Sequence, residues 1–221
     1  MKKILFFVAM LSFAVNTAHA QLREEPYDYM DLVVGGKIGA SAATLTKLGG
    51  DYKLFPYGSF YAELYLSQKI SMALEVSYSR KGTNNVIVQG EQIPEEWREE
   101  FSHWGEEYPY NYHIDYLNTS YLFKFHPVPI INVYTGLCLG RMLSANATFA
   151  DKDVNIRSIV HSGDFSVPVG AEILIGKHLT IDGRWNWSPR GISKGDEAKR
   201  LLGKPCNNFF SVTVGYKFQA L

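Results

Sequence analysis

Three residues late in the chain are the ones best suited to nucleophilic or acid–base chemistry. His161, Ser162 and Asp164 lie in the stretch HSGD and are the residue types of a hydrolytic site. Neighbours on a strand point to opposite faces, so His161 and Ser162 are not expected to meet. We therefore interpret the stretch as a turn entering a strand and predict no catalytic residue in it.

Composition excludes several other classes of site. The remaining histidines have no spacing typical of a metal site, and no glycine-rich phosphate loop is present, so we expect neither metal nor cofactor. Basic and acidic residues number 22 each, which gives no indication of a nucleic-acid partner. Cys138 and Cys206 are too few for a disulfide framework and are expected to stay free.

A second set of residues, all charged, has a spacing that indicates a structural role rather than a catalytic one. Each predicted strand carries one or two charges near its middle, on the face opposite its large apolar side chains, and their signs nearly cancel. A charge removed from water needs an opposite partner, so this pattern favours the interior of a narrow barrel. The predicted lumen charges are Lys37, Glu63, Glu75, Lys124, Arg141, Glu172, Asp182, Arg184 and Lys217.

The stretch LTIDGRWNWS, residues 179–188, illustrates the two faces. Every second residue is apolar or glycine, ending in Trp185 and Trp187, and the intervening residues, including Asp182 and Arg184, are polar. We predict that the polar side points inward and that the tryptophans face lipid.

The N-terminus carries an export signal. Lys2 and Lys3 precede an apolar run of about 12 residues, shorter than the roughly 20 of a spanning helix, and Ala18-His19-Ala20 fits signal peptidase. We expect cleavage after Ala20, which leaves 20 basic against 22 acidic residues. The predicted organisation is a signal peptide at 1–20, a periplasmic lead at 21–31, a barrel domain at 32–218 and a short overhang at 219–221.

Eight strands are predicted in the mature chain. Their connections alternate between tight turns and long loops, so in an up-and-down chain all the turns lie at one end and all the loops at the other. Bacterial outer-membrane barrels have short periplasmic turns and long extracellular loops. The expected strands are 32–45, 56–67, 70–80, 112–125, 130–144, 164–175, 178–188 and 207–218.

The fold class is therefore all-β: an eight-stranded antiparallel up-and-down transmembrane barrel. Aromatic residues are expected in two belts at the membrane interfaces. The outer belt would hold Tyr78, Trp185, Trp187 and Phe210, and the turn-end belt Phe123, Phe125, Tyr134, Tyr216 and Phe218.

The fifth strand, 130–144, fits this alternation least well. Leu137, Leu139 and Leu143 share the phase of Arg141, so a charge and three leucines compete for one face. The sequence gives no clean facing for this strand, and a bulge in it is one interpretation.

Several stretches resemble the PorT-like outer-membrane β-barrel family. They are GGKIGASAATL, DYLNTSYLFKF, VYTGLCLGRMLSA, DFSVPVGAEI, LTIDGRWNWSPRGI and FFSVTVGYKF, which together cover nearly the whole mature chain. The resemblance implies an eight-stranded outer-membrane barrel and, for one branch of the family, an accessory role in type IX protein secretion. This chain departs from the family in having Gln219, Ala220 and Leu221 after its last aromatic residue.

The second long loop is the most distinctive segment outside the strands. Residues 94–105 are expected to form a short helix that begins at Pro94 and places Trp97, Phe101 and Trp104 on one side. These aromatics would form a contact surface for a partner or for the barrel's own mouth, or pack within the loop.

The predicted function is a non-enzymatic structural or interaction barrel of the outer membrane, accessory to secretion if the resemblance extends that far. Expected partners are outer-membrane lipid and lipopolysaccharide, periplasmic chaperones and the barrel-assembly machinery during biogenesis, and a secretion-system or extracellular protein. Two alternatives stay open: a lipid A acyltransferase or deacylase, and a soluble lipocalin-like barrel with its apolar face turned inward to a ligand.

Overall fold

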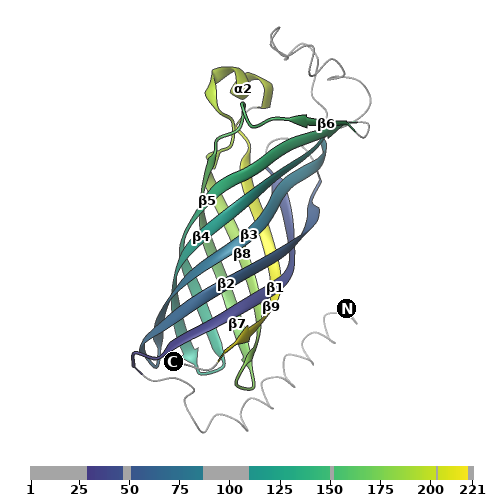
Figure 1. The fold of residues 1–221 in the computed structure, drawn as a ribbon. Helices are drawn as coiled ribbons and strands as arrows, with labels where there is room; N and C mark the ends of the chain where they lie inside the picture. The colour runs from purple at the N-terminus through teal and green to yellow at the C-terminus, as the bar shows by residue number, and fades with distance from the viewer. Residues whose placement is uncertain (1–28, 47–50, 87–109, 150–151, 203, 219–221) are drawn as a thin grey trace, which may run out of the picture.

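The barrel is closed by pairing between the first and last strands of the chain. The computed structural model describes residues 29–46, 51–86, 110–149, 152–202 and 204–218. Eight long antiparallel strands follow one another around the wall, and β1 pairs with both β2 and β9. The predicted eight-stranded up-and-down barrel is confirmed, and Figure 1 shows the strongly tilted strands.

The strand bounds extend beyond the expected ones mainly at the loop end. The long strands are β1 (Leu32–Leu45), β2 (Lys53–Ser67), β3 (Ile70–Val86), β4 (Tyr110–Val128), β5 (Ile131–Phe149), β7 (Gly163–Ile175), β8 (Leu179–Gly191) and β9 (Cys206–Lys217). A short strand, β6 (Lys152–Asn155), pairs with the end of β5, and a helix, α2 (Gly195–Leu202), precedes β9. Neither of these two short elements was predicted.

Turns and loops lie at opposite ends, as expected from the spacing. The turns after Ser67, Val128 and Ile175 are tight, and Gly176 has the positive φ of 66° that favours glycine in such a turn. Figure 1 shows α2 and β6 together at the other end of the barrel. We call these the turn end and the loop end.

Side chains alternate between the two faces of the wall over most of each long strand. In β8 the exposed residues include Ile181, Trp185 and Trp187, whereas Asp182 and Arg184 are buried. Arg184 is only 2% exposed, while Phe60, on β2, is 76% exposed. This distribution is the reverse of that in a soluble protein, where large apolar residues are inside and charges outside.

At the loop end, beyond the charged section, the inward-facing side chains differ in chemical type. There the inward residues are apolar, and they pack with α2 and with the segment that leads into β7. The cluster consists of Leu45, Val86, Tyr112, Ile114, Tyr116, Met142, Ala145, Ala147, Ile156, Ile159, Val160, Ile192 and Ala198, with Val154 packed against it. This part of the chain has an apolar core of the kind found in soluble proteins.

Four sequence predictions concern residues outside the described ranges. The signal peptide, most of the periplasmic lead and the overhang at 219–221 lie there, as does the loop that carries Trp97, Phe101 and Trp104. In the part of the chain that is described, no helix is long and apolar enough to cross a membrane.

Both cysteines are free, as predicted from their strands. Cys138 lies on β5 and Cys206 at the start of β9, and β7 and β8 separate these strands. A disulfide needs Cα atoms within about 7 Å, which this separation does not allow.

We expect thiol labelling of the unfolded, unreduced protein to modify both cysteines. In the folded protein Cys206, which is partly exposed, should react faster than the buried Cys138. Mass spectrometry of the labelled peptides measures both rates. A disulfide-linked peptide pair from freshly unfolded protein would contradict the strand order.

Candidate functional site: the charged interior of the barrel

The centre of the interior is a bidentate ion pair between β8 and β3. Arg184 donates through Nη1 to Oε1 of Glu75 and through Nη2 to Oε2 at 2.8 Å. Two tyrosines complete the arrangement: Tyr134 accepts from Arg184 Nε at 2.9 Å, and Tyr57 donates to Glu75 at 2.9 Å. A planar guanidinium suits such a site because its fixed fork matches a carboxylate.

Lys37 extends the network toward the turn end. Its Nζ lies 2.6 Å from Glu172 Oε2 and 3.2 Å from Asp182 Oδ2. Asp182 also accepts a hydrogen bond of 2.6 Å from Tyr134, so that tyrosine links Asp182 to Arg184. The two ion-paired groups on β8 are thus held by one bridging hydroxyl.

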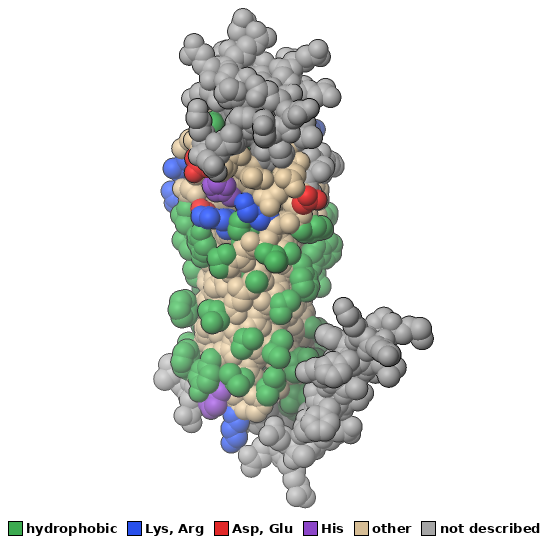
Figure 2. All heavy atoms as spheres, turned by 90° about the vertical axis from the view of Figure 1, so that its right-hand side faces the viewer, with side chains coloured by type: hydrophobic (Ala, Val, Ile, Leu, Met, Phe, Trp, Pro, Cys, Tyr) green, Lys and Arg blue, Asp and Glu red, His purple; other side chains and the backbone are tan. Residues whose placement is uncertain are grey.

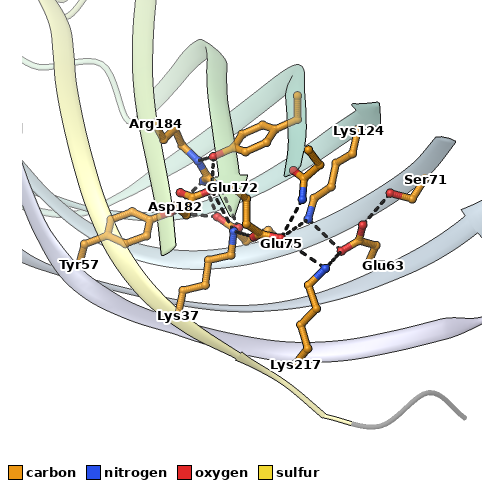
Figure 3. Close-up of polar contacts among 12 residues, drawn as sticks. Lys37, Tyr57, Glu63, Ser71, Glu75, Lys124, Glu172, Asp182, Arg184 and Lys217 are labelled. Atoms are coloured by element: carbon orange, nitrogen blue, oxygen red, sulfur yellow. Dashed lines mark hydrogen bonds and ion pairs between the residues drawn. The ribbon is translucent and has the colours of Figure 1, made fainter. Parts of the chain in front are cut away.

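Glu63, on β2, anchors the turn end of the network. Its Oε2 lies 2.8 Å from Lys124 Nζ and 3.4 Å from Lys217 Nζ, and Ser71 donates to its Oε1 at 2.6 Å. Both lysines also approach Glu172 Oε1, at 3.6 Å for Lys124 and 3.3 Å for Lys217. Glu172 therefore joins this group to Lys37 (Figure 3).

The charges of this network balance. Four basic groups face four acidic ones, all nearly inaccessible to solvent; they are Lys37, Lys124, Arg184 and Lys217 against Glu63, Glu75, Glu172 and Asp182. These residues come from seven strands, and β5 contributes Tyr134 together with Asn132, which donates to Glu172 at 3.0 Å. Every long strand is thus tied to the network.

Two glycines make room for the inward tyrosines. A Cβ on Gly35 would lie 2.4 Å from Tyr61 Oη, and one on Gly170 would lie 2.4 Å from the ring of Tyr134. Each tyrosine therefore lies over the paired glycine of the neighbouring strand, where a larger residue would displace it. Lys37 Nζ lies 5.2 Å from the Tyr61 ring centre and 5.8 Å from that of Tyr134, within cation–π range.

Arg141 is not part of the network, so its predicted place in the lumen was wrong. It is exposed on the outer wall in phase with Leu137 and Leu139, while Tyr134 and Cys138 point inward. Asp115 pairs with Ser144 but Tyr116 with Met142, so the bulge considered for this strand lies at Leu143. Beyond it the inward phase shifts to Ala145 and Ala147.

Tyr134 was also misplaced, since it was expected in the turn-end aromatic belt. It is buried in the interior because the phase of β5 that turns Arg141 outward turns Tyr134 inward. The other eight aromatics assigned to the two belts are exposed on the outer wall.

Sequence reasoning missed a second interior ion pair nearer the loop end. Lys81 Nζ lies 2.6 Å from Asp164 Oδ2, and Ser188 donates to the same oxygen at 3.3 Å. The lysine ammonium also lies 4.9 Å from the ring centre of Tyr116 and 4.8 Å from that of Phe209. The signal was present in the alternation of β3, but the expected strand ended at Arg80, one residue before Lys81.

The structure separates Asp164 from His161 in the HSGD stretch. Asp164 is held by Lys81 and Ser188 inside the barrel, whereas the backbone of His161 pairs with Ile192 in the loop region. Burial, together with nearby cationic side chains, lowers the pKa of His161.

Another serine, histidine and carboxylate do meet, at the turn end, but in a different arrangement. Ser71 lies 2.9 Å from His126 Nε2, and its hydroxyl donates to Glu63. In a hydrolase the serine donates to the histidine and the acid binds the other ring nitrogen. Ser71 is also fully buried, so a substrate has no access to it.

Within the described residues no cluster of histidine, cysteine and acidic side chains could hold a metal ion. The interior contains paired charges and tyrosines, which can stabilise the barrel and exclude solutes.

Comparisons with known proteins give similar folds at low sequence identity. No family model matches the sequence, and none of the curated proteins matches it. Among solved structures, Ail, the attachment invasion locus protein of Yersinia pestis, has a TM-score of 0.49 at 11% identity, covering 86% of this chain and 99% of that one.

Two further solved structures are similar to the same extent. A major outer membrane protein from Thermus thermophilus has a TM-score of 0.49 at 13% identity, with 85% and 99% covered. Neisserial surface protein A has a TM-score of 0.48 at 12% identity, with 85% and 97% covered. Likeness at this level carries no information on ligand or partner, so function has to be argued from the chain's own surfaces.

We predict that Glu75→Gln destabilises the barrel by about 3–5 kcal/mol, because it leaves the guanidinium of Arg184 buried without its partner. Asp182→Asn should cost less, since Lys37 keeps its contact with Glu172. Denaturant unfolding in detergent micelles measures both free energies.

A double-mutant cycle provides the control. Glu75→Gln combined with Arg184→Gln should destabilise by clearly less than the sum of the two single changes, because no unpaired charge remains. Asp196→Asn, in the exposed pair with Lys199, should change little. Additive effects of the two interior changes would show that the pair is not coupled.

Proposed function

We propose that the protein is an integral outer-membrane barrel with a closed interior and no catalytic activity. The observation that carries the proposal is the inversion of the wall: charges and hydrogen-bonded tyrosines inside, and large apolar side chains outside. In water such an outer surface would be an aggregation hazard, whereas hydrocarbon solvates it. A lipocalin-like barrel needs the opposite arrangement and is not favoured.

The length of the outward apolar run fits a membrane. On β8 it extends from Leu179 to Trp187, on β4 from Leu117 to Phe125, and on β9 from Phe210 to Phe218. Each run is about nine residues, and a tilted transmembrane strand needs about 9–11. The neighbouring strands β8 and β9 and the distant strand β4 therefore support the same hydrocarbon thickness.

The outward apolar runs together form a band around the barrel, and charged residues lie at both of its ends. At the loop end, the exposed Arg141 and the pair of Arg80 with Asp115 lie on the outer wall. At the turn end Lys69 and Lys177 are exposed. Figure 2 shows hydrophobic side chains around the middle of one face, with basic side chains above and below them.

The proposed orientation puts the tight turns in the periplasm and the long loops outside. It matches the usual architecture of outer-membrane barrels and the export signal read from residues 1–20. The chain would be processed after Ala20, met by periplasmic chaperones and inserted by the barrel-assembly machinery.

Because the interior is closed, a function in binding has to use the outer surfaces of the barrel. Eight strands leave room only for side chains, and here the ion network fills that room below an apolar cover. We propose an interaction role for the loop end, accessory to protein secretion as the PorT-like resemblance implies. A lipid-modifying activity is the weaker alternative, because neither serine–histidine–acid group has the geometry of a triad.

The protein should fractionate with outer membranes and migrate differently on gels before and after heating, as closed barrels do. Ile181→Arg, which places a charge in the apolar band, should cost about 2–4 kcal/mol of unfolding free energy in lipid vesicles. Ser158→Arg, at an exposed loop-end position, is the matched control and should cost little. Recovery of the native chain as a soluble periplasmic protein would refute the proposal.

Exchange of the long loops for those of an unrelated eight-stranded barrel separates the interaction role from enzymatic activity. In a strain that lacks the native protein, we expect the loop-exchanged barrel not to restore the wild-type phenotype. The lipid A mass spectrum of the cells should stay unchanged. An altered acyl pattern on deletion of the protein would instead establish the lipid-modifying alternative.

A further inference from the structure

Three chain segments are joined by backbone hydrogen bonds just beyond the loop end of β8. His161 N donates to Ile192 O, Ile192 N to Pro205 O, and Lys194 N to Ile159 O, each at 2.8 Å. Val160 and Ser193 form a further antiparallel bridge. This small ladder fixes the relative positions of residues far apart in the sequence.

The ladder gathers basic side chains from all three segments. They form what we call the rim cluster: His161, Arg190, Lys194, Lys199 and Lys204. Lys204 packs beside Gly191, next to Arg190, since a Cβ on that glycine would lie 3.4 Å from the Cβ of Lys204. The four lysine and arginine residues are exposed.

Few negative charges compensate this cluster. Lys199 is paired with Asp196 at 2.8 Å. Arg190, Lys194 and Lys204 have no carboxylate partner among the described residues. Burial and, after it, the nearby positive charges of Arg190, Lys194 and Lys199 lower the pKa of His161.

Arg190, at the strand end of the rim cluster, lies at the depth of lipid headgroups if the apolar band spans the membrane. Arg190 follows Trp187 by three residues, or about 10 Å along the strand and about 7–8 Å along the membrane normal after tilt. Headgroups occupy roughly the first 5–8 Å beyond the hydrocarbon. Trp185 and Trp187, exposed on the same strand, mark the interface.

We propose that the rim cluster binds the phosphate groups of outer-leaflet lipid. This inference rests on the proposed membrane location. Lipid A carries phosphates at the headgroup level, where exposed ammonium and guanidinium groups without carboxylate partners supply complementary charge. The ladder holds these groups on one side of the barrel, so the lipid contact is local rather than a uniform charge effect.

The test compares two variants that each remove two exposed positive charges. Arg190→Gln/Lys194→Gln changes the rim cluster, and Lys69→Gln/Lys177→Gln changes the turn end. Folded barrels in detergent are titrated with diphosphoryl lipid A, and bound lipid is counted by native mass spectrometry. We expect the affinity to fall about fivefold for each rim charge removed and to stay within about twofold of wild type for the turn-end variant.

Inorganic phosphate distinguishes the source of the anion. In large excess it should leave lipid A bound, because the acyl chains on the barrel wall hold the lipid. Complete displacement by phosphate would assign the site to free phosphate and overturn the proposal, and so would equal affinities of both variants and the wild type.

Gel migration before and after heating reports folding of each variant. If the double rim variant does not fold, Lys194→Gln alone carries the test, with an expected loss of about fivefold. Failure of the wild type to insert into vesicles would refute the membrane location itself, whereas insertion without any lipid A preference would refute this inference alone.

Discussion

The neutral ion network inside the barrel is the constraint on which the rest of the structure depends. Four cations and four carboxylates from seven strands share one dry interior, and each would be costly there without its partners. The Arg184–Glu75 pair spans the barrel from β8 to β3, so the strands cannot slip in register without separating buried charges. Tyr134 and Tyr57 extend the same constraint to β5 and β2. The rings of Tyr61 and Tyr134 pack closely over Gly35 and Gly170.

The wall is adapted to two environments along its length. Around the ion network the outward residues are apolar, and the backbone of every long strand is paired on both sides, as a hydrocarbon environment requires. Toward the loop end the inward residues become apolar, and Ile156, Ile192 and Ala198 of the connecting segments pack against them. The interior changes from charged to apolar at the level where Arg141, Arg80 and Asp115 lie on the outer wall.

Because side chains occupy the interior, the outer surfaces of the molecule are the better candidates for function. The charges in the lumen satisfy one another, and the serines near histidines are either buried, as Ser71 is, or lack an acid, as Ser162 does. What remains available is the loop end, with its rim cluster and long connections. A barrel of this kind can hold a surface at a fixed height and orientation above the membrane, which suits an interaction role.

The sequence by itself determined the strand number, the placement of turns and loops, and the facing of most residues, because an antiparallel wall with two unlike sides imposes an alternation of period two. Asp182 and Arg184 could be assigned to the inside from that alternation alone. Arg141 and Tyr134 could not: both lie on the turn side of the bulge at Leu143, and only the structure shows that Arg141 shares the outward phase of Leu137 and Leu139 while Tyr134 points inward. An outward arginine is tolerated there because Arg141 lies at the loop-end limit of the apolar band. The pairing of the interior charges could not be predicted from the sequence either. Arg184 meets Glu75 across the interior, and only closure of the barrel decides which distant strands face each other.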